Sequence, residues 1–345
     1  MTAAALDTRP LRHWLHTADR PYLVVCCAEH PDPGAWAHAV LRQGIHHAVV
    51  QLDTCVTQAS PAVLLELIAG GASGITVALD GCADREGAGV LVARASDLLT
   101  ALQPLRATQE RAGDERATTG RTGASQTGAS QTGGDRAIDG AEVLPPPREH
   151  APTWPVVHVD AVPMSRRALL GRPDGLEVAE PSVHPTERLV SALLELAGGQ
   201  DPGTVLDGIP TGVPRLTAAA CAGSGVCEHT CPDGALVVTS VVLADAAADR
   251  PEMSQFQLTF APGRCTDCGQ CLQVCPEKAL VRSGEYLWSS LLDGGPVSLR
   301  VGLVRRCARC GSPHGRVGDL CAVCAFRAAN PFGSAMPPGW PDAQE

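Results

Sequence analysis

The chain has 345 residues, enough for two or three domains, and carries a formal net charge of −10. An acidic chain argues against a nucleic-acid-binding surface, which needs a basic face, and no apolar run is long enough to predict a transmembrane segment. The first residues also lack the apolar core of a secretory signal peptide, so we expect a cytoplasmic protein. Since disulfides are rare in a reducing compartment, the fifteen cysteines predict bound metal.

Residues 20–105 contain alternating strand and helix patterns. We expect strands at 22–27, 48–52 and 75–79, and helices at 34–43, 61–69 and 90–102. Ser60 and Pro61 are typical of a helix start, as the N-cap and the first helical residue. Because strands that alternate with helices form parallel sheets, we expect a small α/β domain here. Its elements suit a flavodoxin-like arrangement.

The next two segments are less regular. Residues 106–150 contain the direct repeat TGASQTGASQ and the run LPPP but no apolar periodicity, so we expect a disordered linker. Such a tether would let one domain move between a donor and an acceptor. Residues 151–215 are expected to form a connecting segment, with a strand at 156–159 and an amphipathic helix at 186–197.

The most specific motif is a run of four cysteines closed by a proline: Cys265, Cys268, Cys271, Cys275 and Pro276. A tight loop of this spacing points three thiolates at one iron–sulfur cluster, and in two-cluster proteins the fourth cysteine ligates the other cluster. The equivalent fourth position upstream is Cys231, which is also followed by proline. The spacing therefore predicts a [4Fe–4S] cluster held by Cys231, Cys265, Cys268 and Cys271.

The upstream half of this region lacks one cysteine. With Cys231 aligned as the fourth ligand, Cys227 is the third, Cys221 is the first and Ser224 stands in the second position. The second cluster would then have three thiolates, those of Cys221, Cys227 and Cys275. One iron would be weakly held, so we expect either a [3Fe–4S] cluster or a [4Fe–4S] cluster whose fourth iron takes Ser224 or a solvent oxygen. A second site that has lost its cluster is the remaining alternative.

Residues 216–290 resemble the bacterial dicluster ferredoxins. Each fourth cysteine is followed by a similar segment, PDGALVVTS or PEKALVRSG, and the intervening QFQLTF is strand-like. The resemblance implies an α+β ferredoxin-like domain with a pseudo-twofold βαβ fold and two neighbouring clusters. It also implies one-electron transfer at low potential.

Residues 300–330 hold a small C-terminal module with four cysteines. Ten residues separate its two C-x2-C pairs, which are Cys307 with Cys310 and Cys321 with Cys324. Two such turns present four thiolates tetrahedrally, as Zn²⁺ prefers, so we expect a zinc-ribbon-like module. A single iron ion and free thiols are the alternatives. Arginines cluster here too, but in an acidic chain they are interpreted as a solvated face.

Four further cysteines follow the predicted strands of the first domain: Cys26, Cys27, Cys55 and Cys82. The carboxyl ends of parallel strands meet at one edge of a sheet, where ligands gather. The order of these features resembles the iron–sulfur delta subunit of methyl-viologen-reducing hydrogenase. That resemblance implies a [2Fe–2S] cluster held by Cys27, Cys55 and Cys82, with Cys26 or His30 as the fourth ligand.

The first domain also departs from that family. The family has a further cysteine three residues after its Cys-Cys pair, where this chain has His30, and another after its Gly-Cys turn, where none is found. A histidine ligand would raise the potential of a cluster. The alternative is a domain that has lost its cluster and serves only for docking.

These motifs together predict an electron-transfer subunit with no bond-making chemistry of its own. The hydrogenase resemblance implies redox-enzyme partners, namely a [NiFe] hydrogenase, a formate dehydrogenase or a heterodisulfide-reductase-like complex. A catalytic iron–sulfur reductase is an alternative, but the sequence has no glycine-rich nucleotide motif, and Ser224 is its one hint of an open metal position. An iron–sulfur regulator is another, but no helix-turn-helix signature is present.

Overall fold

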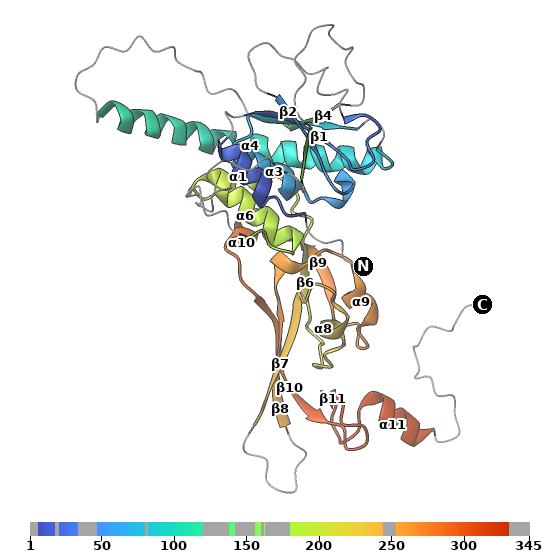
Figure 1. Cartoon of the computed structure of the whole chain (residues 1–345). Helices are drawn as coiled ribbons and strands as arrows, with labels where there is room; N and C mark the ends of the chain where they lie inside the picture. The colour runs from blue at the N-terminus through green and yellow to red at the C-terminus, as the bar shows by residue number, and fades with distance from the viewer. Residues whose placement is uncertain are drawn as a thin grey trace, which may run out of the picture. The chain divides into compact units, whose positions relative to one another are not determined.

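The computed structural model describes residues 6–17, 21–33, 47–79, 82–119, 138–141, 156–159, 162, 180–243 and 253–330. The chain divides into two compact units (Figure 1). Unit 1 comprises Met1–Pro210 and Leu287–Leu292, and unit 2 comprises Thr211–Tyr286 and Asp293–Glu345. Within these described segments, no helix combines the length and the apolar content that a membrane span requires.

Unit 1 is built on a five-stranded parallel sheet. Its strands are β1 (Tyr22–Cys26), β2 (His47–Gln51), β3 (Gly74–Ala78), β4 (Ile138–Ala141) and β5 (Val156–His158). They lie in the order β4-β3-β1-β2-β5, and each neighbouring pair is parallel, so the α/β prediction is confirmed. The first four strands follow the flavodoxin-like order, but β5 lies beside β2, whereas that order places the fifth strand beside the fourth.

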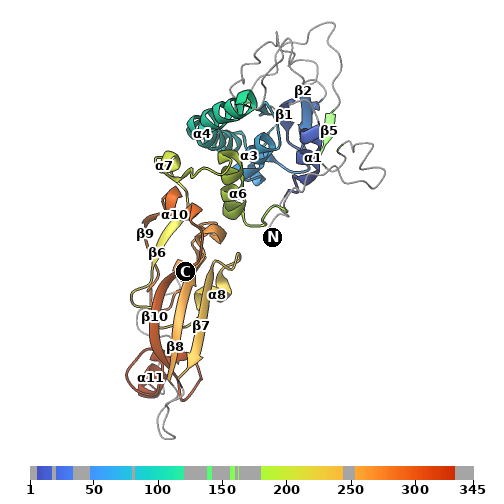
Figure 2. The ribbon, with the colours of Figure 1, turned by 90° about the vertical axis from the view of Figure 1, so that its left-hand side faces the viewer.

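The structure describes six helices in unit 1. They are α1 (Arg9–Thr17), α3 (Pro61–Ala69), α4 (Arg85–Thr119), α6 (Pro185–Ala197), α7 (Gly203–Leu206) and α10 (Trp288–Leu292), with the 3-10 turn η1 (Val56–Gln58). Helix α3 contacts α1, α4 and α6, which Figure 2 shows from a second side. It begins as predicted, because the Ser60 hydroxyl accepts a hydrogen bond from the backbone N–H of Ala62, and Pro61 is its first residue.

A buried ion pair joins three segments of unit 1. Arg188 of α6 donates to both carboxylate oxygens of Glu66 in α3, at 2.6 Å from Nε and 2.7 Å from Nη2. The Thr8 hydroxyl donates to the same carboxylate and accepts from Arg188 Nη2 at 3.2 Å. All three side chains are buried, so each charged group depends on these partners for the hydrogen bonds that water would otherwise supply.

The expected linker differs from the structure at two places. Helix α4 continues through Pro104 to Thr119, because the residues after the proline are mostly strong helix formers and a proline removes only one helical donor. Strand β4 pairs with β3. Both stretches fall within 106–150, so the expectation of disorder is wrong for them. The rest of that range lies outside the described residues, as does the helix expected at 34–43.

Unit 2 contains two similar halves. Its elements are β6 (Pro214–Thr217), α8 (Val226–Thr230), β7 (Leu236–Val242), β8 (Met253–Phe260), η2 (Pro262–Arg264), α9 (Gln270–Val274), β9 (Val281–Glu285), β10 (Val297–Arg306), β11 (Pro313–His314) and α11 (Ala322–Ala329). The order β6-α8-β7 recurs as β8-α9-β9. Strand β6 pairs antiparallel with β9, and β7 pairs antiparallel with β8, which gives the expected pseudo-twofold βαβ arrangement (Figure 1).

The strands next to the C-terminal cysteines belong to the same sheet as β7 and β8. Strand β10 pairs antiparallel with β8 from Val297 to Arg305, and β11 pairs with the end of β10. The sheet therefore runs in the order β11-β10-β8-β7. The module expected at 300–330 begins inside a strand of the ferredoxin-like region, so the two form one unit.

The core of unit 2 lies against the inner face of β8. Its side chains at Phe256, Leu258 and Phe260 are buried, and they alternate with exposed positions as a half-buried strand requires. A β-carbon added at Gly223 or Gly302 would come within 2.7 Å of the Phe256 ring. The absence of a side chain at both glycines therefore makes room for this aromatic ring.

Candidate iron–sulfur and metal sites

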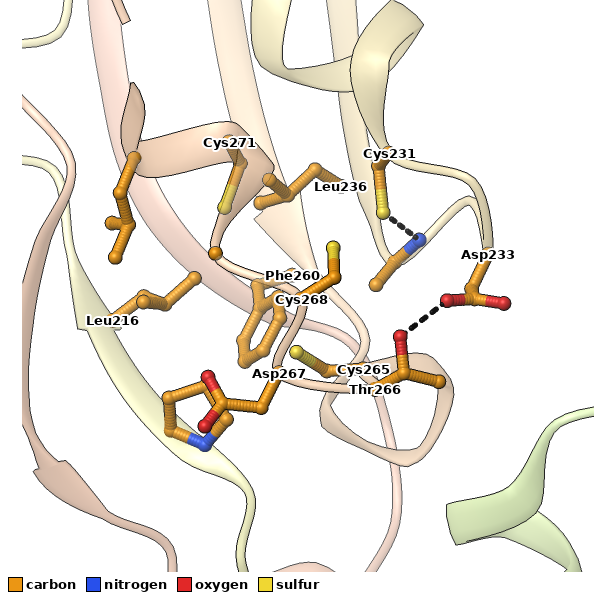
Figure 3. A pocket seen from close by; sticks show the side chains of 14 residues that line it. Leu216, Cys231, Asp233, Leu236, Phe260, Cys265, Thr266, Asp267, Cys268 and Cys271 are labelled. Atoms are coloured by element: carbon orange, nitrogen blue, oxygen red, sulfur yellow. Dashed lines mark hydrogen bonds between the residues drawn. The ribbon is translucent and has the colours of Figure 1, made fainter. Parts of the chain in front are cut away.

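The first candidate site is a pocket lined by four cysteines from two parts of unit 2. Cys265 and Cys268 come from the loop between η2 and α9, Cys271 comes from the first turn of α9, and Cys231 comes from the end of α8. Figure 3 shows their four sulfur atoms pointing into the same space. Apolar side chains complete the wall: Leu216, Leu236, Phe260 and Leu272. The structure thus brings Cys231 to the three downstream cysteines.

The backbone turns of the two cysteine loops repeat at equivalent positions. Residues with positive φ are Gly223 (+68°), Gly225 (+76°) and Gly234 (+61°) upstream, and Asp267 (+56°), Gly269 (+70°) and Lys278 (+50°) downstream. Such angles are uncommon for residues with a β-carbon, so Asp267 and Lys278 mark a conformation that the loop itself requires. The upstream loop keeps this conformation although Ser224 replaces the cysteine equivalent to Cys268.

Burial and backbone donors set the chemistry of the first site. Burial raises the pKa of the Cys265 thiol to about 11, against a backbone hydrogen bond from Asp267, and negative charge on Cys271 and Cys231 raises it further. The backbone N–H of Ala235 donates to Cys231 Sγ at 3.3 Å (Figure 3). Four thiolates that face one pocket need positive charge among them, which the irons of a cluster would supply.

A second group forms around Cys227. Burial raises the pKa of this thiol to about 11, and negative charge on the nearby Cys221 and Cys275 raises it further. The backbone N–H of Ala279 donates to Cys275 Sγ at 3.2 Å, as Ala235 does to Cys231 in the other half. The structure therefore brings Cys275 to the two upstream cysteines.

Backbone donors also reach the upstream loop. The N–H of Gly223 donates to Cys221 Sγ at 3.4 Å, and the half-buried Ser224 follows directly. Hydrogen bonds to the sulfurs are one of the means by which a protein tunes an iron–sulfur cluster. The upstream loop itself offers two thiols, those of Cys221 and Cys227, with the Ser224 hydroxyl at the position equivalent to Cys268.

The third group comprises the four cysteines of the C-terminal module. All four sulfur atoms lie within 4.8 Å of one another, and Cys310 Sγ is 3.7 Å from Cys321 Sγ. Cys307 follows β10 directly, and Cys321 caps α11 by accepting the backbone N–H of Cys324 at 3.4 Å. Zn–S bonds of about 2.3 Å in a tetrahedron place the sulfurs about 3.8 Å apart, so this group has the dimensions of a single-ion site.

The cysteines of this third group influence one another's pKa values. A backbone hydrogen bond from Cys321 is the main reason that the pKa of Cys307 is lowered, to about 6. Burial, and then the neighbouring thiols, raise the pKa of Cys324 to about 12. A hydrogen bond with the Ser312 side chain lowers the pKa of Cys310 as well. The thiol of Cys324 is therefore the one that depends most on a bound cation to lose its proton.

The fourth group lies at the carboxyl edge of the unit 1 sheet. Cys27, Cys55 and Cys82, which follow β1, β2 and β3, have their sulfur atoms within 4.8 Å of one another. The Cys55 sulfur lies 3.9 Å from that of Cys27 and 3.8 Å from that of Cys82. The expectation that three strand ends deliver thiols to one place agrees with these distances.

Two other predicted ligands of this domain lie outside the group. Cys26 is fully buried in β1, and neighbouring residues of an extended chain point to opposite faces, so its side chain and that of Cys27 diverge. The ring of His30 is also buried, and its Nδ1 accepts a hydrogen bond from the backbone N–H of Asp32 at 3.2 Å. Neither residue joins the three thiols in the structure.

The sequence analysis missed two donors beside these thiols. The backbone N–H of Val56 donates to Cys27 Sγ at 3.3 Å, and the Thr57 hydroxyl donates to Cys55 Sγ at 3.2 Å. The available signal was a hydroxyl residue two positions after a cysteine at a strand end. Both bonds favour the thiolate form, which is the form that binds metal.

The part of the chain that holds the ferredoxin loops is similar to known proteins. Residues 212–279 match the family described as the 4Fe-4S dicluster domain. A stretch of 60 residues, 17% of this chain, is 35% identical to the polyferredoxin protein MvhB of Methanothermobacter marburgensis, of which it spans 13%. The ferredoxin resemblance is thus confirmed over these residues. The chain therefore contains a region of the ferredoxin type, which is similar to domains that hold [4Fe–4S] clusters.

Proposed function

We propose that this protein is an electron-transfer subunit that passes single electrons between a redox enzyme and an acceptor. The observation that carries the proposal is the convergence of Cys231 with Cys265, Cys268 and Cys271 on one pocket. These four would hold a [4Fe–4S] cluster. Such a cluster supplies one-electron chemistry, and no substrate needs to reach it.

The side chains around this pocket would position and protect the cluster. Leu216, Leu236 and Phe260 line it and limit the access of water. The backbone N–H of Ala235 directs a hydrogen bond at a ligating sulfur. Burial and hydrogen bonds to sulfur are the two means by which these residues would set the potential.

The second cluster would be held by Cys221, Cys227 and Cys275. We favour a [3Fe–4S] cluster there, because the loop has the turns of a cluster-binding loop but offers a hydroxyl at Ser224. Since the two loops belong to one pseudo-twofold domain, the second cluster would lie next to the first. Electrons would then pass from one to the other without leaving unit 2.

The remaining parts of the chain would serve stability and docking. Structural Zn²⁺ in the C-terminal module would fix the end of β10, which Cys307 follows directly. Unit 1, with its likeness to the hydrogenase delta subunit, would dock on the partner complex. The net charge of −10 suits a basic surface on that partner. A [NiFe] hydrogenase, a formate dehydrogenase or a heterodisulfide-reductase-like complex fits this role.

The proposal is tested on the full-length protein purified without oxygen. We expect about seven ferredoxin irons per chain, an EPR signal of a three-iron cluster in the oxidised protein and a four-iron signal after reduction. The Cys268→Ser variant should lose the four-iron signal. Cys26→Ser, which alters a buried cysteine far from these loops in the sequence, should keep both signals. Fewer than about four irons per chain would defeat the proposal.

A second function is favoured by one observation, the hydroxyl at Ser224. An iron without a fourth thiolate could bind a small substrate, which would make the protein a reductase. Steady-state assays with an artificial electron donor and no partner protein distinguish the two functions. Turnover of a small substrate that is lost in Ser224→Cys would favour catalysis. Electron delivery to a purified partner, with no such turnover, would favour the relay.

A further inference from the structure

The described thiols of this protein fall into two classes by spacing. In the C-terminal module and in the group of Cys27, Cys55 and Cys82, all sulfur atoms lie within 4.8 Å of one another. No such group forms among the cysteines of the ferredoxin loops, all of which belong to the described residues. Thiolates around a multi-iron cluster are held apart by the irons and sulfides between them. Thiolates around one ion share its coordination sphere.

The three strand-end thiols have the closer spacing. The Cys55 sulfur lies 3.9 Å from that of Cys27 and 3.8 Å from that of Cys82, close to the edge of about 3.8 Å expected for a tetrahedron of sulfurs around one zinc ion. These two distances also match the 3.7 Å between Cys310 and Cys321 in the C-terminal module. Two regions with unrelated folds thus present thiols at the same distance.

This spacing does not fit the [2Fe–2S] cluster that the hydrogenase resemblance implies. Each iron of a two-iron cluster takes two protein ligands, so at least one of three ligating thiolates must lie across the sulfide bridge from the other two. The third sulfur would then be well separated from its partners. Instead, Cys55 Sγ is almost equally close to the sulfurs of Cys27 and Cys82.

The surroundings of the three sulfurs suit a bound cation. The Val56 N–H and the Thr57 hydroxyl donate to two of them and orient them as ligands. Cys27 is buried, whereas Cys55 and Cys82 are half-buried, so an ion can enter from solvent. Each thiol follows a different parallel strand, so an ion bound to all three would join the carboxyl ends of β1, β2 and β3.

We propose that Cys27, Cys55 and Cys82 form a single-ion Zn²⁺ site that cross-links three strand ends of unit 1. The choice of zinc follows from the soft thiolate donors and their tetrahedral spacing. A solvent oxygen or another group supplies the fourth ligand. The inference concerns unit 1 and stands independently of the function proposed for unit 2.

The test measures zinc, iron and sulfide in full-length protein produced with both metals in the medium and purified without oxygen. The comparison is made in a background with both Cys307→Ser and Cys310→Ser, which leaves the C-terminal module two of its four thiols and so removes its ion. Adding Cys55→Ser should remove one further zinc per chain and leave iron and sulfide unchanged. The matched control is Cys26→Ser, which changes a cysteine of β1 outside the group and should retain the zinc.

A measurement on the unaltered protein covers the case in which Cys55→Ser fails to fold. Treatment with a zinc chelator should increase alkylation of Cys27, Cys55 and Cys82, detected by mass spectrometry, as zinc is released. Loss of iron and sulfide together in Cys55→Ser would identify a two-iron cluster and overturn the inference. Retention of all metal in that variant, or alkylation that does not change with chelation, would also overturn it.

Discussion

The ring of Phe256 lies directly against the backbone of Gly223, where a β-carbon would come within 2.7 Å of it. Gly223 forms a left-handed turn beside Ser224, in the loop of the second cluster site. Gly302 of β10 lies equally close to the same ring. One core side chain of β8 therefore determines where this loop rests on the sheet.

Substituting this glycine should displace the loop. We expect Gly223→Ala to lower the free energy of unfolding by about 1–3 kcal/mol and to reduce the iron bound at the second site. Gly225→Ala is the matched control, because Gly225 has a similar φ of +76° but no atom within 4 Å of an added β-carbon. Iron analysis and chemical denaturation of both variants give the comparison. Equal losses would mean that backbone strain, and not the ring, determines the effect.

Restoring the missing thiolate should change the second cluster. In Ser224→Cys, the upstream loop regains the spacing of the downstream one, so we expect one additional iron per chain. The three-iron EPR signal of the oxidised protein should disappear. Ser224→Ala, which adds no ligand, should keep both the iron content and the signal of the unaltered protein. An unchanged spectrum in Ser224→Cys would show that the hydroxyl position does not face an iron.

The C-terminal module should protect the second cluster. An added β-carbon at Gly315, next to β11, would lie 3.9 Å from the side chain of Ala222, which follows Cys221. We expect the double variant Cys307→Ser/Cys310→Ser to lose the C-terminal ion and to release iron to a chelator faster from the second site than from the first. Arg309→Ala, a change at the neighbouring exposed residue, should behave as the unaltered protein. Equal release from both sites would contradict a local effect.

The buried ion pair of unit 1 should be sensitive to loss of one partner. In Glu66→Gln, the guanidinium of Arg188 keeps its buried position without its counter-ion, so we expect a loss of about 3–5 kcal/mol in the free energy of unfolding. Replacing both residues with apolar ones should restore most of it. Asp7→Asn is the control, because its pair with Arg9 is exposed to solvent and should contribute far less to stability than the buried pair. Thermal unfolding of the three variants gives the losses in stability that are compared.

The spacing of the cysteines in the sequence predicted which of them line the first iron–sulfur site. Cys265, Cys268 and Cys271 lie in one short loop, and a loop that short limits which thiols can meet. The assignment of Cys231 to this set rested on the pattern of two-cluster proteins, in which the fourth cysteine of one motif ligates the other cluster, and the structure brings Cys231 to the same pocket. The alternation of strands and helices in unit 1 was equally readable, because it depends on local apolar periodicity.

Tertiary structure alone decided which residues meet at the unit 1 sheet edge. The sequence predicted Cys27, Cys55 and Cys82 as ligands and left Cys26 or His30 as the fourth, and the structure places neither of these two with the three thiols. The linker prediction failed at 106–119 and 138–141, because a helix beyond a proline and a short edge strand leave little local signal.

The distances between the sulfur atoms of the ferredoxin cysteines are likewise decided by the tertiary structure. The spacing of cysteines along the chain indicates which thiols can share a site, and by itself it predicted iron–sulfur binding. The distance between sulfurs depends on strand order and sheet register, which bring together residues far apart in the chain. That distance separates the wide ferredoxin sites from the close three-thiol group of Cys27, Cys55 and Cys82.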